Sequence, residues 1–101
     1  MVQATTPTFT LTLPSTVDLD EAAHVKFTME QCGQVISKDE SEMTISGNVV
    51  TVQLDQEDTL NFGSAFDAKI QLNWTYSDGS RAATKIKTVH VDENLYKDVI
   101  E

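Results

Sequence analysis

Residues 68–76, with the sequence AKIQLNWTY, alternate apolar and polar side chains along their whole length. A period of two places every second side chain on the same side of an extended chain, so this pattern predicts a half-buried β-strand. Its apolar face includes Trp74 and Tyr76. Asp78-Gly79 follows, a pair that favours the positive φ angles of a hairpin turn. We therefore expect residues 82–91 to return as the partner strand.

The apolar phase of this partner strand changes partway along. Ile86 has the opposite parity to Val89 and Val91, so a regular strand could not bury all three on one face. Two explanations stay open. A β-bulge near Lys87 or Thr88 would bring the two halves into phase, and so would burial of both faces against a neighbouring chain.

Alternation recurs upstream, and helical periodicity is nearly absent. It predicts five further strands, at residues 8–13, 24–31, 34–38, 43–46 and 49–54. Pro14 ends the first strand, while Gly33 and Gly47-Asn48 supply tight turns. Asp55 and the acidic residues after it favour one short helical turn near residues 56–61. Residues 92–101 have apolar side chains at roughly helical spacing and either dock as a short C-terminal helix or trail from the domain.

These elements predict the fold class and the domain organisation. About seven short strands separated by turns are typical of an all-β, antiparallel two-sheet sandwich of immunoglobulin-like or jelly-roll type. A chain of 101 residues has room for one core, so we expect a single domain over residues 8–101. Residues 1–7 are expected to be a flexible N-terminal segment.

Charge narrows the classes of partner. The chain has 7 Lys and Arg against 16 Asp and Glu, a formal net charge of −9. Phosphate groups require clustered basic side chains, so we expect no nucleic acid and no membrane as a partner. The N-terminal residues lack the features of a signal peptide. We therefore expect synthesis in the cytoplasm, and later export inside an assembled particle is compatible with this.

The residues that could support catalysis are few and scattered. Cys32 is the only cysteine, and His24 and His90 fall on the predicted polar faces of their strands. A hydrolase would need a nucleophile beside an oriented base, and a zinc site would need four ligands. The acidic runs at residues 18–21 and 39–42 lack the ligand pattern of an EF-hand. We expect no enzymatic activity, no cofactor and no metal site.

Protein contacts are the remaining candidate for function. Thr8, Thr10 and Thr12 lie on a strand with few of the charges that normally protect a sheet edge from pairing. Phe62 and Phe66 lie in a turn-like connection that either plugs one open end of the sandwich or forms an interface. Leu95 and Tyr96 add apolar groups near the C-terminus. We expect these seven residues to form the interface with other protein chains, most simply in a homo-oligomer.

Two other functions stay open at this point. An acidic chain could act as a small inhibitor or regulator that covers a basic surface of another protein. Solvent-facing aromatic residues such as Phe66 and Tyr96 could instead serve a carbohydrate-binding module.

Three stretches carry a resemblance. They are TPTFTLTLP at residues 6–14, VTVQLDQEDT at residues 50–59 with Phe62, and Asp78-Gly79 before RAAT at residues 81–84. Together they resemble small structural-cluster proteins that tailed phages and prophages of Gram-positive bacteria encode among their tail and baseplate genes. The similarity extends from about Thr6 to Leu95. It implies a virion structural or assembly role, with tail, baseplate or neck components as partners, and it supplies no catalytic residue.

Overall fold

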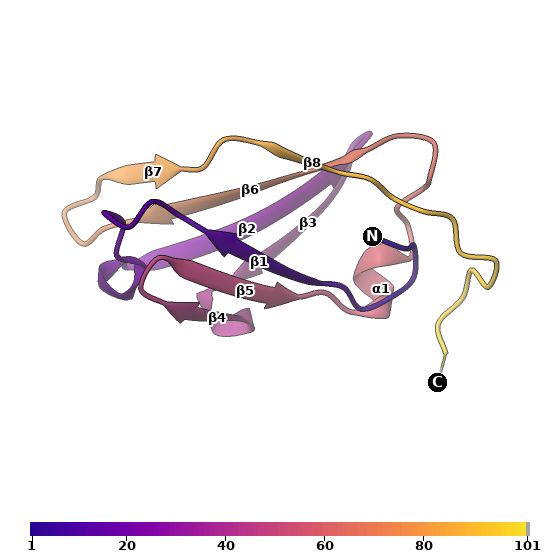
Figure 1. The fold of residues 1–101 in the computed structure, drawn as a ribbon, viewed down its shortest axis with the longest axis horizontal. Helices are drawn as coiled ribbons and strands as arrows, with labels where there is room; N and C mark the ends of the chain where they lie inside the picture. The colour runs from indigo at the N-terminus through magenta and orange to yellow at the C-terminus, as the bar shows by residue number, and fades with distance from the viewer. Residues whose placement is uncertain (101) are drawn as a thin grey trace.

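Two antiparallel β-sheets pack face to face in the computed structural model, which describes residues 1–100 (Figure 1). The smaller sheet has the order β1-β5-β4, made of β1 (Thr8–Thr12), β5 (Val49–Gln53) and β4 (Met43–Ser46). The larger sheet has the order β3-β2-β6, made of β3 (Gln34–Asp39), β2 (His24–Gln31) and β6 (Ala68–Thr75), and β7 (Arg81–Ala83) and β8 (Lys87–Val89) both pair with β6. The predicted all-β sandwich is confirmed.

Three short helical turns carry the chain from one sheet to the other. They are η1 (Leu19–Glu21), η2 (Glu40–Glu42) and α1 (Gln56–Thr59). The predicted helical turn near residues 56–61 is thus α1, and the Asp58 carboxylate at its start accepts a 2.8 Å hydrogen bond from the Asp55 N–H. No helix within residues 1–100 has the length and apolar character needed to cross a bilayer.

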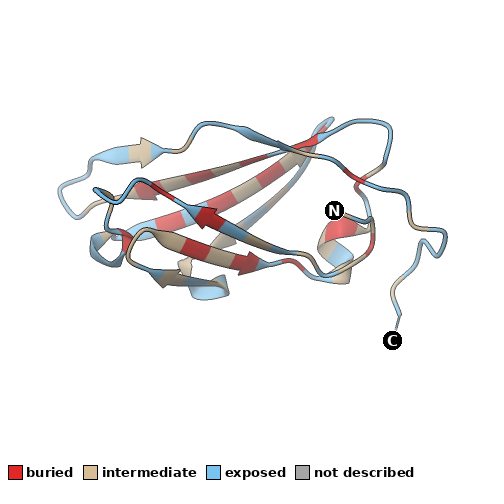
Figure 2. Ribbon diagram, viewed as in Figure 1, coloured by how far each residue is buried: buried red, intermediate tan, exposed pale blue. Residues whose placement is uncertain are grey.

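The core lies between the sheets and follows the predicted alternation. Along β2 and β6 every second residue is buried, which appears as stripes in Figure 2. Val25 pairs with Trp74 and Phe27 with Leu72 across these strands, and Phe27 stacks on Phe9 of the other sheet with 5.9 Å between ring centroids. Each such side chain stabilises the fold by about 1.5–3 kcal/mol when buried.

A bulge explains the phase change in the last predicted strand. Ala83 pairs with Asn73 in β7 and Lys87 pairs with Ile70 in β8, so residues 84–86 lie opposite only Gln71 and Leu72. The extra residue divides the strand in two and leaves Ile86 exposed. A β-bulge near Lys87 or Thr88 was one of the two predicted explanations; the extra residue lies slightly earlier, within residues 84–86, and it does not bring Ile86 onto the buried face of Val91.

Both ends of the described chain differ from expectation. Residues 1–7 were predicted to be a flexible segment, but Gln3 N–H donates to Asp92 O at 2.9 Å and Ala4 is buried. Residues 92–100 form no helix, so of the two predicted alternatives the C-terminal helix is wrong and the trailing segment describes them. These residues follow the surface in an irregular path, and Gln56 contacts Ile100 there through two hydrogen bonds.

Candidate functional site

The β1 strand is one edge of the smaller sheet, as its position in the order β1-β5-β4 shows. Its alternation turns Phe9 and Leu11 toward the core and leaves the side chains of Thr8, Thr10 and Thr12 exposed. None of the three threonines carries a charge. The predicted exposure of these residues at a sheet edge is therefore present in the fold.

The main-chain groups of the same threonines face away from the sheet. Pro7 O accepts from Leu54 N–H at 3.0 Å, and Leu13 N–H donates to Asn48 O at 2.8 Å, so odd-numbered residues bond toward β5. In an antiparallel pair, successive residues point their N–H and C=O groups to opposite sides. Thr8, Thr10 and Thr12 therefore present their donors and acceptors at the free edge, where another strand could pair.

An apolar cleft of about 500 Å³ opens beside this edge, between β1 and the β7–β8 side of the larger sheet. Leu11, Leu13 and Val17 form one wall, and Ile70 and Trp74 form the other. These residues belong to the core cluster or pack against it, so the cleft exposes part of the interior of the sandwich. Sequence analysis missed the cleft, because its two walls come from segments more than fifty residues apart.

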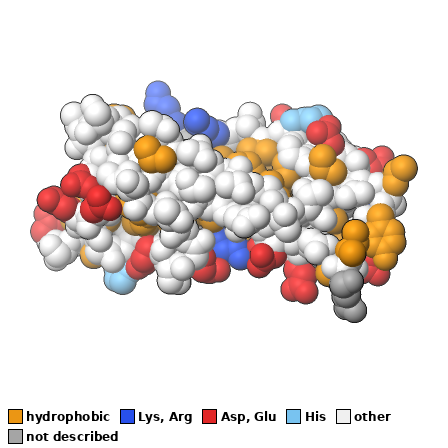
Figure 3. All heavy atoms as spheres, turned by 60° about the horizontal axis from the view of Figure 1, so that its bottom comes forward, with side chains coloured by type: hydrophobic (Ala, Val, Ile, Leu, Met, Phe, Trp, Pro, Cys, Tyr) orange, Lys and Arg blue, Asp and Glu red, His pale blue; other side chains and the backbone are white. Residues whose placement is uncertain are grey.

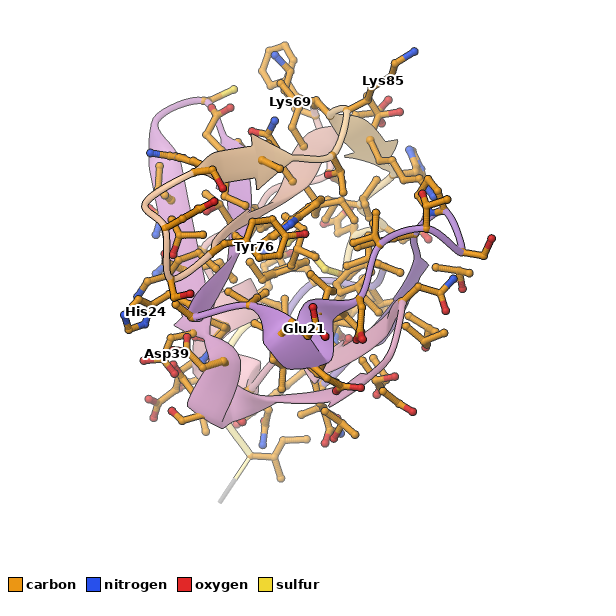
Figure 4. The ribbon with its side chains drawn as sticks, turned by 90° about the vertical axis from the view of Figure 1, so that its left-hand side faces the viewer. Glu21, His24, Asp39, Lys69, Tyr76 and Lys85 are labelled. Carbon is orange, nitrogen blue, oxygen red and sulfur yellow. The ribbon has the colours of Figure 1, made fainter. Side chains whose placement is uncertain are left out.

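Basic side chains line the rim of the cleft. Lys85 lies in the bulge and Lys87 follows it, and both border the opening. Neither forms an ion pair with another of residues 1–100. Figure 4 shows Lys85 pointing outward, whereas Tyr76 points into the space between the sheets. There the Tyr76 hydroxyl accepts a 3.1 Å hydrogen bond from Trp74 Nε1.

The connection that contains Phe62 and Phe66 separates these two predicted interface residues. Phe62 is 0% exposed and belongs to the core, so its predicted role as a surface anchor is wrong. Gln31 holds the loop in place, because its Nε2 donates to Gly63 O and Phe66 O, both at 2.7 Å. Phe66 is 64% exposed. The alternative prediction, in which this loop closes one end of the sandwich, describes Phe62.

The remaining predicted residues lie near the C-terminus. Leu95 is 94% exposed and Tyr96 is 58% exposed, and Ile100 is exposed as well. Figure 3 shows hydrophobic side chains gathered at the right-hand end of the molecule. The structure thus places the predicted residues at the β1 edge, in the Phe66 loop and on the C-terminal segment, and does not bring them into one surface.

The histidines and acidic turns have structural partners. His24 Nδ1 lies 2.9 Å from Glu40 Oε1, and His90 lies within 3.3 Å of Asp67. The main-chain N–H of Glu40 itself, the His24 ring and the Val25 N–H lower the pKa of the Glu40 carboxyl to about 2. Figure 4 shows His24 and Asp39 at the same end of the sandwich. Within residues 1–100, no three His, Cys, Asp or Glu side chains are grouped as metal ligands.

No protein-family model matches the chain, and no curated protein shows significant sequence similarity to it.

Proposed function

We propose that the protein has no enzymatic activity and works by binding other protein chains through the free edge of β1. The observation that carries this proposal is the uncharged edge itself, where Thr8, Thr10 and Thr12 leave main-chain donors and acceptors unused in the sheet. Edge strands are usually protected by charges, prolines or bulges within the strand, and β1 has none of these. A second strand added here would extend the smaller sheet.

The biological setting that we propose is a tailed phage particle, in which the protein is a structural or assembly component of the tail, baseplate or neck. The resemblance of residues 6–14, 50–59 and 78–84 supports this setting. Such particles are built by repeated association of small domains, and an unprotected sheet edge suits repeated association.

The β1 edge is tested by replacing Thr10 with proline. Thr10→Pro removes a main-chain N–H that points away from β5, so the ladder within the sheet stays intact and the chain should fold. We expect the oligomer seen by sedimentation velocity to dissociate in Thr10→Pro, whereas Thr10→Val, which keeps the N–H, stays associated. A folded Thr10→Pro protein with an unchanged assembly state would rule out this edge.

The particle setting requires a separate experiment. Mass spectrometry on particles purified from the host that carries the gene should find the chain in stoichiometric amounts relative to tail proteins. Finding it only in particle-free lysate would contradict a virion role and would favour the regulator alternative.

A further inference from the structure

The strand order resembles that of an immunoglobulin domain without its first strand. In such domains one sheet contains strands A, B, E and D in that order, and the other contains C, F and G, with C′ added in some. Here β1-β5-β4 corresponds to B-E-D, and β3-β2-β6-β7 corresponds to C′-C-F-G. Every hairpin and every crossing between sheets falls at the matching place. The neighbour of β1 that strand A would supply is not formed by any of residues 1–100.

The apolar cleft lies where that neighbour would be. It runs along the free edge of β1 and reaches the bulge between β7 and β8. Residues 1–3 already lie at one end of the position that strand A would fill, because Val2 forms a parallel bridge with Asp92 just after β8. A strand that filled the rest of this position would lie antiparallel to β1 and cover Leu11, Ile70 and Trp74.

We propose that this cleft binds the C-terminal segment, residues 93–100, of a second copy of the chain as an added strand. The proposal rests on the proposed self-association at the β1 edge, and it names the segment that pairs there. The segment has the apolar groups that the cleft needs, since Leu95, Tyr96 and Ile100 are exposed in their own chain. Fully extended, it would measure about 26 Å, which is longer than a five-residue strand such as β1.

Charge favours the same occupant. The segment has two acidic residues, Glu93 and Asp98, against one basic residue, Lys97, which pairs with Glu93 at 2.9 Å, and Lys85 and Lys87 border the cleft. In a chain with net charge −9, most surfaces repel a second acidic copy, so the basic rim is an exception. The segment is tied to its own chain near its start, where Asn94 Nδ2 donates to Gln3 O at 2.9 Å. Beyond Asn94, the only hydrogen bonds among residues 1–100 that tie it to the rest of the chain are exposed ones between Gln56 and the main chain of Ile100.

The geometry of this contact is head-to-tail. Figure 1 shows the C-terminal segment leaving the sandwich at the end opposite to the β6–β7 turn, so donor and acceptor surfaces are different parts of the molecule. A contact between two different surfaces is heterologous and, unless two copies exchange their segments reciprocally, generates rings or open filaments. We therefore expect assembly to continue beyond a dimer as concentration rises.

The first test uses full-length variants in sedimentation velocity. Leu95→Asp places a charge on a side chain that is 94% exposed, so folding should be unaffected. We expect this variant to be monomeric where the unmodified chain is associated. Val35→Asp is the matched control, because Val35 is also apolar and exposed but lies on β3, away from the cleft and the segment.

The second test measures binding directly. A peptide with the sequence of residues 93–100 is titrated into the full-length Leu95→Asp protein, and Trp74 fluorescence is followed, because Trp74 lines the cleft and is the only tryptophan. We expect saturable binding that a scrambled peptide does not show. Lys85→Glu with Lys87→Glu in the receiving chain should weaken it about tenfold.

The outcomes separate the two proposals. In one outcome, association is lost in Thr10→Pro but survives in Leu95→Asp, and the peptide does not bind. This result would support the β1 edge and would overturn residues 93–100 as the segment that pairs with it. Peptide binding to a chain that stays monomeric supports the cleft site and contradicts self-association at working concentrations. A change in Trp74 fluorescence that depends on Leu95 but not on protein concentration would show that residues 93–100 bind the cleft of their own chain. It would overturn the proposal that a second copy supplies the segment.

Discussion

Cys32 and Ala4 are the two non-glycine residues among residues 1–100 whose main chain has a positive φ angle, and Cys32 is the one in a hairpin turn. It lies in the two-residue turn between β2 and β3 with φ of +48°, and Gly33 follows with φ of +89°. Side chains other than glycine and asparagine pay about 1–2 kcal/mol for this left-handed conformation. The alternation of β2 and β3 determines that the turn has two residues, and Cys32 adopts the conformation that this turn requires.

Replacing Cys32 with asparagine should therefore stabilise the protein. We expect Cys32→Asn to raise the free energy of unfolding by about 0.5–1 kcal/mol in urea titrations, because asparagine suits this turn position. Gly33→Ala should act in the opposite direction. Equal stability of Cys32→Asn and the unmodified chain would show that the turn is not strained.

Glu40 links stability to pH at the other end of the β2–β3 hairpin, beside His24. Its carboxyl pKa falls from 4.5 to about 2, so its stabilising contacts are complete above pH 4.5 and are lost as the pH drops toward 2. When thermal unfolding is measured between pH 4.5 and about pH 2, the Tm of Glu40→Gln should fall less than the Tm of the unmodified chain. Glu57→Gln, at a glutamate outside the hydrogen bonds described, serves as control and should follow the unmodified chain.

Among the secondary-structure elements, the interrupted β7–β8 strand is held to β6 by hydrogen bonds at Thr84, whose carbonyl also accepts from Gln71 Nε2 at 2.9 Å. Thr84 N–H donates to Leu72 O at 2.9 Å, and the Thr84 hydroxyl accepts from Leu72 N–H at 3.1 Å. The hydroxyl thus takes the place of a carbonyl that the bulge has moved away. This contact keeps β6 fully paired at the point where the cleft begins.

Thr84→Val should test this contact, because valine keeps the shape and removes the acceptor. We expect a loss of about 1–3 kcal/mol in the free energy of unfolding, since the Leu72 N–H loses its partner. Thr88→Val in β8, where the threonine is exposed, is the matched control and should change stability by less than about 0.5 kcal/mol. A Thr84→Val protein as stable as this control would show that water replaces the hydroxyl.

At the scale of the whole molecule, local patterns predicted the strands, and contacts between distant segments determined the rest. The bounds of β2 were predicted to the residue, because both ends of its alternation are marked by turns. Phe62 and Phe66 could not be distinguished in the sequence, since Gln31 from another strand decides which of them is buried. The anchoring of Met1 was equally hidden, because its amino group donates to His90 O, 89 residues away.

Phe27, which is buried in the core, and Phe66, which is exposed, allow the contribution of core packing to stability to be tested. Phe27→Ala should cost about 3–5 kcal/mol, because it empties a position that is 0% exposed and contacts both sheets. Phe66→Ala should change stability by less than about 0.5 kcal/mol. Chemical denaturation compares the two, and a large effect of Phe66→Ala would mean that its loop packs more tightly than its exposure indicates.

The hairpin tip that carries Cys32 has a practical consequence. The chain contains one thiol, and it is exposed at the end of the β2–β3 hairpin, away from the walls of the cleft. A nitroxide spin label can be attached there without any engineered cysteine. In a filament each label would have neighbours at a regular repeat, whereas a two-fold dimer would give a single interlabel distance, so electron paramagnetic resonance would distinguish these symmetries.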